Sequence, residues 1–295
     1  MAIAKKTTAV ATVDELKTST ALTTVVDDSG YGDYEGAGFE NQDKEDYSLP
    51  FIHILQGLSP QLETIDGASP GKIINTVTND LYPGKEGGVV FVPAHTIHCF
   101  VEWKPKEQGG GFVAQHGLTA DVVVHAKETQ DFGSFKTPSG NELTETFYVY
   151  GVLVNGDGGD QAVIAFTSTK IKKYKAWMTK ARSIQIAIKD AEGRVLRRIT
   201  PPLFAHRFRL TTVKEKNSKG EFFNWNINFD GADAAACRIS PKSDLFLSAA
   251  AVATMVQDGA AKVDYNKQGG AEDVVNTTGG AAASSGGDSS DDAPF

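Results

Sequence analysis

Apolar and β-branched residues are concentrated in several short stretches of this chain, which turn-forming residues separate. These stretches are residues 72–78, 88–103, 121–126, 144–154 and 161–167. Runs of Val, Ile, Thr and aromatic residues bounded by Gly, Pro, Asn or Asp are typical of strands. The pattern therefore predicts a series of strands, and Pro93 leaves open whether residues 88–103 form one long strand or two.

Two further stretches predict a β-hairpin. Residues 203–214 and 221–229 are separated by the turn-forming sequence NSKG. Within the second stretch the aromatic and aliphatic residues alternate with asparagines, as in FFNWNINF, so that the two kinds face opposite sides of a strand. Two such runs joined by a short turn are a hairpin signal.

Two stretches show helical spacing instead. Ile171, Tyr174, Met178 and Ala181 fall on one face of a helix over residues 168–183, with Ser168 as its predicted cap. A second helix is predicted over residues 242–257, with Ser243 as its cap. The order of elements favours a mainly β (α+β) fold, a barrel or sandwich with at least two accessory helices.

Both ends of the chain differ from its middle. Residues 1–45 and 259–295 are rich in small, polar and acidic residues and lack apolar periodicity, so we expect flexible, acidic, disordered segments around one domain at residues 46–258. The net charge is −8, but the two acidic ends account for more than all of it. The predicted domain is therefore mildly basic.

Signals for catalysis, metals and membranes are weak. Cys99 and Cys237 are the two cysteines, too few for a disulfide framework, and no signal peptide or membrane-length apolar run is present. No phosphate-binding loop of the G-x-x-x-x-G-K-[ST] type occurs. His95 and His98 would face opposite sides of a strand, which argues against a metal site. We expect no enzymatic activity and no cofactor.

Positive charge is concentrated between Lys170 and Lys219, where fifteen Lys or Arg residues stand against three acidic ones. Cations neutralise phosphates without sequence preference, and aromatic rings stack on exposed bases. This combination predicts a single-stranded nucleic-acid groove. Its predicted contact residues are Lys172, Lys173, Lys175, Trp177, Lys180, Arg182, Arg207, Phe208 and Arg209. The alternative is a solvated basic surface above core aromatics.

The C-terminal residues provide a second indication. Asp288, Asp291 and Asp292 precede Pro294 and Phe295, an acidic string that ends in an aromatic residue. The tip resembles the C-terminal tip of bacterial single-stranded DNA-binding proteins, which has acidic residues followed by Pro-Phe. In that family the tip recruits other DNA-processing proteins, so the resemblance implies a partner-binding tail.

The order of segments over residues 39–230 resembles phage-encoded single-stranded DNA-binding proteins. The matching segments include FIHILQGLSPQL, GKIINTVTNDLY, VVFVPAHTIHCFVEW and TSTKIKKYKAWM. The resemblance implies an oligonucleotide-binding (OB) barrel of five strands and sequence-independent binding of single-stranded DNA. It also implies a role in phage replication, recombination or repair in the host bacterial cytoplasm. Residues 104–142 have no assigned place in such a barrel.

Two alternatives remain open at this stage. One is a phage protein that binds a host protein, such as an inhibitor of a polymerase or nuclease. The other is a structural or scaffolding protein of the virion. A preference for DNA over RNA and homo-oligomer formation are not readable from the sequence.

Overall fold

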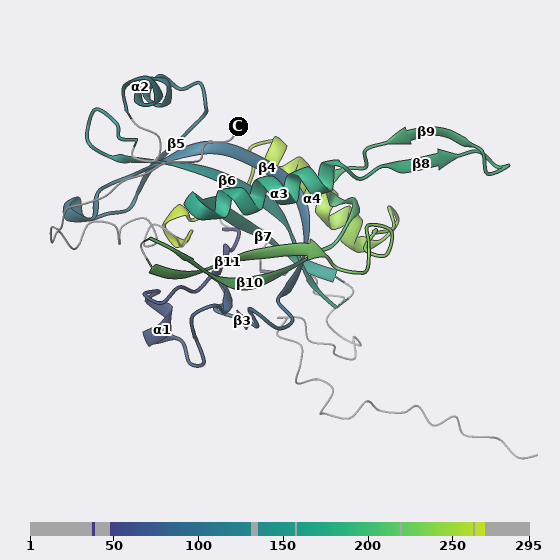
Figure 1. Ribbon diagram of the computed structural model, residues 1–295, viewed down its shortest axis with the longest axis horizontal. Helices are drawn as coiled ribbons and strands as arrows, with labels where there is room; N and C mark the ends of the chain where they lie inside the picture. The colour runs from purple at the N-terminus through teal and green to yellow at the C-terminus, as the bar shows by residue number, and fades with distance from the viewer. Residues whose placement is uncertain are drawn as a thin grey trace, which may run out of the picture.

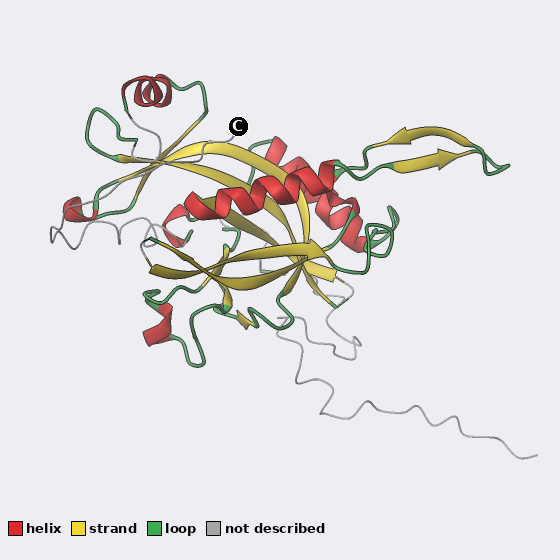
Figure 2. Cartoon of the chain, viewed as in Figure 1, coloured by secondary structure: helices red, strands yellow, loops and turns green. Residues whose placement is uncertain are grey.

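An antiparallel six-stranded sheet is the main element of the fold (Figures 1 and 2). The computed structural model describes residues 37–38, 48–130, 135–156, 158–218, 220–261 and 263–268. The strands of the sheet are β4 (Val89–Trp103), β5 (Phe112–His116), β6 (Glu142–Asn155), β7 (Gly158–Thr167), β10 (Phe208–Asn217) and β11 (Gly220–Phe229). The predicted mainly β class is confirmed.

The strands follow a Greek-key order. Neighbours in the sheet run β11-β10-β4-β6-β7, and β5 pairs with the far end of β4. β10 returns beside β4 after a long connection that contains helix α3 (Ile171–Arg182) and the two-stranded ribbon of β8 (Ile186–Lys189) and β9 (Val195–Ile199). Three consecutive strands with a fourth beside the first define this topology.

The sheet is open between its two edge strands. In the part of the chain that the structure describes, no ladder joins β7 to β11, and α3 contacts both strands. The sheet is therefore not a closed barrel, and the helix packs where closure would occur.

One side of the sheet forms a core with α3. All five strands of the Greek key contribute to it, together with Trp177, Tyr174 and Met178 of the helix. Phe91, Phe166 and Phe208 surround the indole of Trp177 with ring centres 5.5–6.4 Å away. Because every strand contributes, this is the inner side of the curved sheet, and we call it the inner core.

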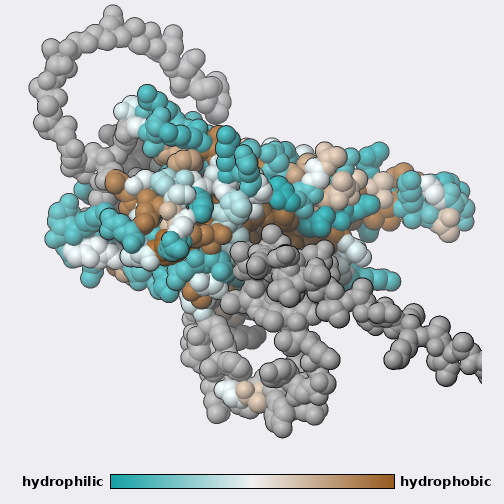
Figure 3. Space-filling view, turned by 90° about the horizontal axis from the view of Figure 1, so that it is seen from below, coloured by the Kyte–Doolittle hydropathy of each residue, from teal (hydrophilic) through white to brown (hydrophobic). Residues whose placement is uncertain are grey.

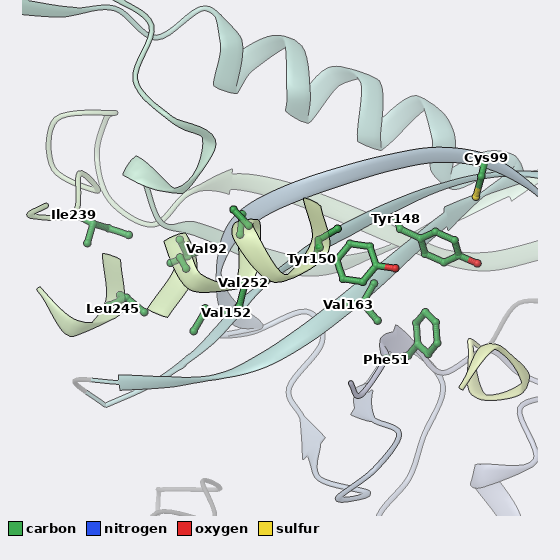
Figure 4. Packing of buried hydrophobic residues seen from close by; sticks show 14 of the residues in the cluster. Phe51, Val92, Cys99, Tyr148, Tyr150, Val152, Val163, Ile239, Leu245 and Val252 are labelled. Carbon is green, nitrogen blue, oxygen red and sulfur yellow. The ribbon is translucent and has the colours of Figure 1, made fainter. Parts of the chain in front are cut away.

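The other side of β4, β6 and β7 is covered by helix α4 (Asp244–Gln257). Val252 of the helix packs near Val152 and Tyr150 of β6 (Figure 4). The Ser243 hydroxyl caps α4 by accepting a hydrogen bond from the backbone N–H of Phe246, as the sequence predicted. This outer core leaves little of the outer face of β6 and β7 open to solvent.

The long strand β4 is continuous through Pro93. A bulge between Pro93 and His95 absorbs the missing N–H, since the register with β6 shifts there. Gly151 lies opposite Pro93, and a Cβ at Gly151 would lie 2.1 Å from the carbonyl oxygen of Val92. The strand can bend here because residue 151 is glycine.

Residues 121–126 are helical rather than extended, so the predicted strand is wrong. They begin α2 (Asp121–Thr129), which places Val123 and Ala126 against Phe100, Phe135 and Leu143. Spacing of three residues puts both side chains on one helical face. The described part of residues 104–142, which lacked a place in a five-stranded barrel, forms this lobe and includes β5.

The remaining elements are small. A three-stranded sheet consists of β1 (Ile52–Ile54), β2 (Ile73–Asn75) and β3 (Leu81–Tyr82), and helix α1 (Gln61–Thr64) lies between β1 and β2. Short 3-10 helices span Lys106–Gln108, Ser168–Lys170, Leu203–Ala205 and Tyr265–Lys267. Ser168 does not cap α3, because it starts the 3-10 turn and has a positive φ of 49°.

Candidate nucleic-acid interface

The outer side of α3 carries a row of cations. Lys172, Lys175 and Arg182 are exposed and follow helical spacing, and we call these three residues the basic ridge. The opposite side of the helix packs into the inner core. Among the described residues, no acidic side chain forms an ion pair with any cation of the ridge. Their charge is therefore available to a partner.

Two other lysines connect α3 to the β10–β11 hairpin. The Lys173 ammonium lies 2.6 Å from Glu215, and its hydrogen bond holds the pKa of that carboxyl below its usual range. Lys180 donates to Asn228 Oδ1 at 3.4 Å and lies 5.1 Å from the ring centre of Phe229. Lys173 is thus neutralised by an acid, whereas Lys180 has no acidic partner among the residues that the structure describes.

Arg207 and Arg209 share one carboxylate. Arg209 Nη2 lies 2.6 Å from Asp230 Oδ1, and Arg207 Nε lies 3.5 Å from Asp230 Oδ2. Arg209 also donates through Nη1 to the carbonyl of Gly87 at 2.7 Å. A phosphate would have to compete with Asp230 for both guanidinium groups.

Trp177 and Phe208 are not placed to stack on bases. Trp177 is 2% exposed and Phe208 is fully buried, and the two rings pack edge to face in the inner core. Neither ring offers a free face to a base in this structure, which differs from the DNA-contacting role that the sequence predicted for them. Trp177 lies between lysines in sequence, but the helix turns its side chain inward while the lysines at 173 and 180 remain on the flank.

A different aromatic group reaches the surface beside the ridge. The ring of His98 stacks on Phe147 with centres 3.8 Å apart, and Phe147 stacks on Tyr174 at 4.5 Å. Lys175 Nζ lies 6.0 Å from the centre of Phe147. We call His98, Phe147 and Tyr174 the aromatic column. His98 and Phe147 are directly opposite in the β4–β6 ladder, a pairing that the sequence alone did not establish.

The His98 end of the column is open. Its side chain is 32% exposed, and its Nε2 lies 2.8 Å from Glu145 Oε1. A base could stack on the outer side of a partly exposed ring, since stacking needs only a free face. The Glu145 carboxylate disfavours a phosphate at this point. The position therefore suits a base better than it suits the phosphate backbone of a nucleic acid.

The outer side of the β10–β11 hairpin is polar. Asn226 donates to Thr211 Oγ1 at 3.1 Å, and Asn228 donates to Asn226 Oδ1 at 3.2 Å. Arg209 lies opposite Asn228 in the register. Trp225 on the other side is buried, as the alternation predicts, whereas Asn224 on the polar side is also buried and its Nδ2 donates to Glu215 Oε2 at 2.8 Å. We call Arg209, Thr211, Asn226 and Asn228 the polar strand face, which Lys180 joins to α3.

The β8–β9 ribbon contains basic residues that the sequence analysis did not assign to an element. Lys189, Arg197 and Arg198 are exposed on it. The signal was present, since IAIK and VLRRI are β-branched or aliphatic runs separated by a Gly-containing turn.

Other predicted features fall outside this surface. Asp288, Asp291, Asp292, Pro294 and Phe295 of the tail lie outside the described residues, as does nearly all of the acidic segment 1–45. Cys99 and Cys237 are buried, and burial raises the pKa of the Cys99 thiol to about 12. Within the described ranges, His, Cys, Asp and Glu side chains form no group of three that could hold a metal.

The fold and this surface define a class: a mainly β, Greek-key protein with a basic helical ridge along its open edge. Comparison with protein families is consistent with a phage origin. Residues 17–262 match the family described as Pam3 phage gp34-like protein, and the chain belongs to this family. No curated protein and no solved structure matches the chain. None of the described helices is long and apolar enough to cross a membrane.

Proposed function

We propose that this protein binds single-stranded DNA without sequence preference during replication, recombination or repair of a phage genome. One observation carries the proposal: the ridge cations Lys172, Lys175 and Arg182 are exposed and have no acidic partner among the described residues. Three unneutralised charges in a row, beside amide side chains and a partly exposed aromatic ring, suit a chain of phosphates with bases attached.

The strand order supports the proposal. OB folds are five-stranded, partly open Greek-key barrels that bind oligonucleotides. Here β4, β6, β7, β10 and β11 have Greek-key order, and α3 lies between the third and fourth of them along the chain. We therefore interpret the open sheet as an OB-like barrel whose gap is filled by α3.

The binding surface would nevertheless differ from that of a simple OB fold. OB folds use the face of their second and third strands, which correspond to β6 and β7. α4 covers the outer face of these strands through Tyr150, Val152 and Val163. This leaves the ridge, the polar strand face and the aromatic column as the surface on which DNA would lie.

Each part of this surface has a distinct role in the proposal. The ridge and Lys180 contact phosphates, the asparagines of β11 donate hydrogen bonds to phosphate or base oxygens, and His98 stacks on one base. Four phosphate contacts give a salt slope near −3, which is about a 50-fold loss of affinity between 50 and 200 mM salt. Binding should therefore be salt-sensitive and indifferent to sequence.

The C-terminal tip adds a recruitment role. Asp291, Asp292, Pro294 and Phe295 provide charge and one aromatic side chain, which a pocket with basic residues around it could take. We propose that replication or recombination proteins of phage or host bind there. Removing residues 288–295 should abolish that recruitment and raise DNA affinity at low salt, because the acidic tip competes with DNA for the ridge.

Fluorescence anisotropy with labelled oligo-dT tests the proposal. The variant K172A/K175A/R182A should lower the magnitude of the salt slope by about 2, since each lost contact contributes about 0.7. The matched control is K85A/K242A/K267A, which removes three exposed lysines on other elements. Equal slopes for ridge and control variants would contradict the assignment of the ridge. No binding of the wild-type chain at low salt would refute the function and favour a host-protein binder.

A further inference from the structure

The β8–β9 ribbon projects from the body of the molecule. Figure 1 shows it extending beyond the end of α3, and in Figure 3 the same projection carries both hydrophilic and hydrophobic residues. β8 and β9 pair only with each other in the described structure. An isolated two-stranded ribbon is marginally stable in water, so a projection of this kind would gain stability from a bound partner. We call residues 186–199 the arm.

We propose that the arm grips the nucleic-acid strand that runs along the basic ridge, through Lys189, Arg197 and Arg198. This inference rests on the proposed function and extends it, because it assigns a second, separate element to the same strand. The occupant is single-stranded DNA, for the following reasons of charge and position.

Both acids of the arm pair with one arginine at its turn. Arg194 Nε lies 2.8 Å from Asp190 Oδ2, and its Nη2 lies 3.2 Å from Glu192 Oε2. With four cations and two acids, the arm as a whole keeps a net positive charge. Lys189, Arg197 and Arg198 form no ion pair with the described residues and carry the arm's free charge outward.

The cations occupy both faces of the ribbon. Arg198 lies opposite Ala187, whereas Arg197 lies opposite Ile188, so the two guanidinium groups point to different sides. A DNA strand that passes around the arm could contact both guanidinium groups. A second copy of the arm would instead bring arginines near their own equivalents, and like charges in an interface are costly.

Apolar side chains complete the surface of the arm. Val195 is 51% exposed and Leu196 is 66% exposed, the largest exposures of apolar residues in this part of the chain. The register of the ribbon shifts between Ile188, which pairs with Arg197, and Lys189, which pairs with Val195. Leu196 is therefore the unpaired residue of a bulge in β9. Exposed aliphatic groups next to cations can pack on bases or sugars while the cations hold the phosphates.

The arm continues the line of the ridge. Arg182 ends α3, and β8 begins at Ile186, so the last ridge cation lies at the base of the arm. A helix of 12 residues is about 18 Å long, and four residues of strand add about 13 Å. A short oligonucleotide would occupy the ridge alone, whereas a longer one would reach the arm as well.

Two variants test the arm. K189A/R197A/R198A removes its free charge. The second replaces residues 186–199 by Gly-Gly, which joins neighbouring ends because Gln185 Nε2 donates to Thr200 Oγ1 at 2.9 Å. The control is again K85A/K242A/K267A. Anisotropy is measured with oligo-dT of about 5 and about 20 nucleotides, which bracket the sizes that one OB fold covers.

With the longer oligonucleotide, both arm variants should lower the magnitude of the salt slope by about 2. The ratio of wild-type to variant affinity is then about 16-fold larger at 50 mM than at 200 mM salt. With the shorter oligonucleotide both variants should match the wild type.

The outcomes separate the two proposals. If the wild-type chain binds neither oligonucleotide, the proposed function fails. If it binds and the arm variants match it at both lengths, the arm proposal alone is refuted. A change of oligomeric state in the arm-deletion variant, with DNA affinity unchanged, would also overturn it and assign the arm to a second copy of the chain.

Discussion

Replacement of Trp177 separates a core role from a DNA-contacting role. The indole is 2% exposed and packs against Phe91, Phe166 and Phe208. Its Nε1 has no hydrogen-bond partner in the described structure. Trp177→Ala deletes a large buried ring and should cost about 3–5 kcal/mol of unfolding free energy. For a domain of this size that corresponds to a fall in Tm of about 6–20 °C.

Trp177→Phe should be much milder. It keeps an aromatic ring among the three phenylalanines and removes a buried N–H that lacks an acceptor, which itself costs about 1–3 kcal/mol. The lost volume and the removed donor offset each other, so we expect a change of less than about 1.5 kcal/mol. Thermal unfolding followed by circular dichroism measures both variants.

DNA binding by Trp177→Leu is the decisive assay, because leucine keeps an apolar side chain but removes the π face that phenylalanine would retain. A buried residue should leave oligo-dT affinity unchanged at a temperature at which the variant is fully folded. Loss of a ring that stacks on a base costs about 1–3 kcal/mol, at least a fivefold change in affinity. A loss of that size in the folded Trp177→Leu variant would refute the assignment of Trp177 to the core.

Three further changes test local features of the fold. The depressed pKa of Glu215 means that its ion pair with Lys173 stabilises the fold above about pH 4.3 and loses this effect as pH falls. Glu215→Gln should therefore cost up to about 1 kcal/mol at pH 7 and progressively less as the pH is lowered, by urea unfolding over a series of acidic pH values. Ser243→Ala should cost about 0.5–2 kcal/mol through loss of the α4 cap, seen as a lower Tm with native near-ultraviolet dichroism. Gly151→Ala should cost at least about 1–3 kcal/mol, because its Cβ would meet the carbonyl of Val92, and a Tm equal to wild type would contradict the tight packing at the bulge.

Strands and helices with strong periodicity could be predicted from the sequence. The alternation of Phe223, Trp225 and Ile227 with asparagines identified β11 and its two faces, because neighbouring residues of a strand point to opposite sides. Residues 121–126 were assigned wrongly, since a short apolar run fits a strand or a helix equally well. Packing of Val123 and Ala126 against Phe100 decided between them.

In the candidate site too, local sequence predicted some features and tertiary contacts decided the others. Local sequence identified the charge of residues 170–219 and the helical spacing of α3, since both depend on residues close along the chain. It did not identify which cations are free. Asp230 pairs with Arg207 and Arg209, and Glu215 pairs with Lys173, through contacts that the hairpin creates.

By itself, the sequence determined the mainly β class, the two major helices and the concentration of positive charge, because periodicity and composition are properties of short segments. Only the tertiary structure decided that Trp177 is buried, that α4 covers the outer face of β6 and β7, and that His98 stacks on Phe147. These features depend on which elements meet. That choice is made by the burial of whole faces against one another, which no single segment specifies.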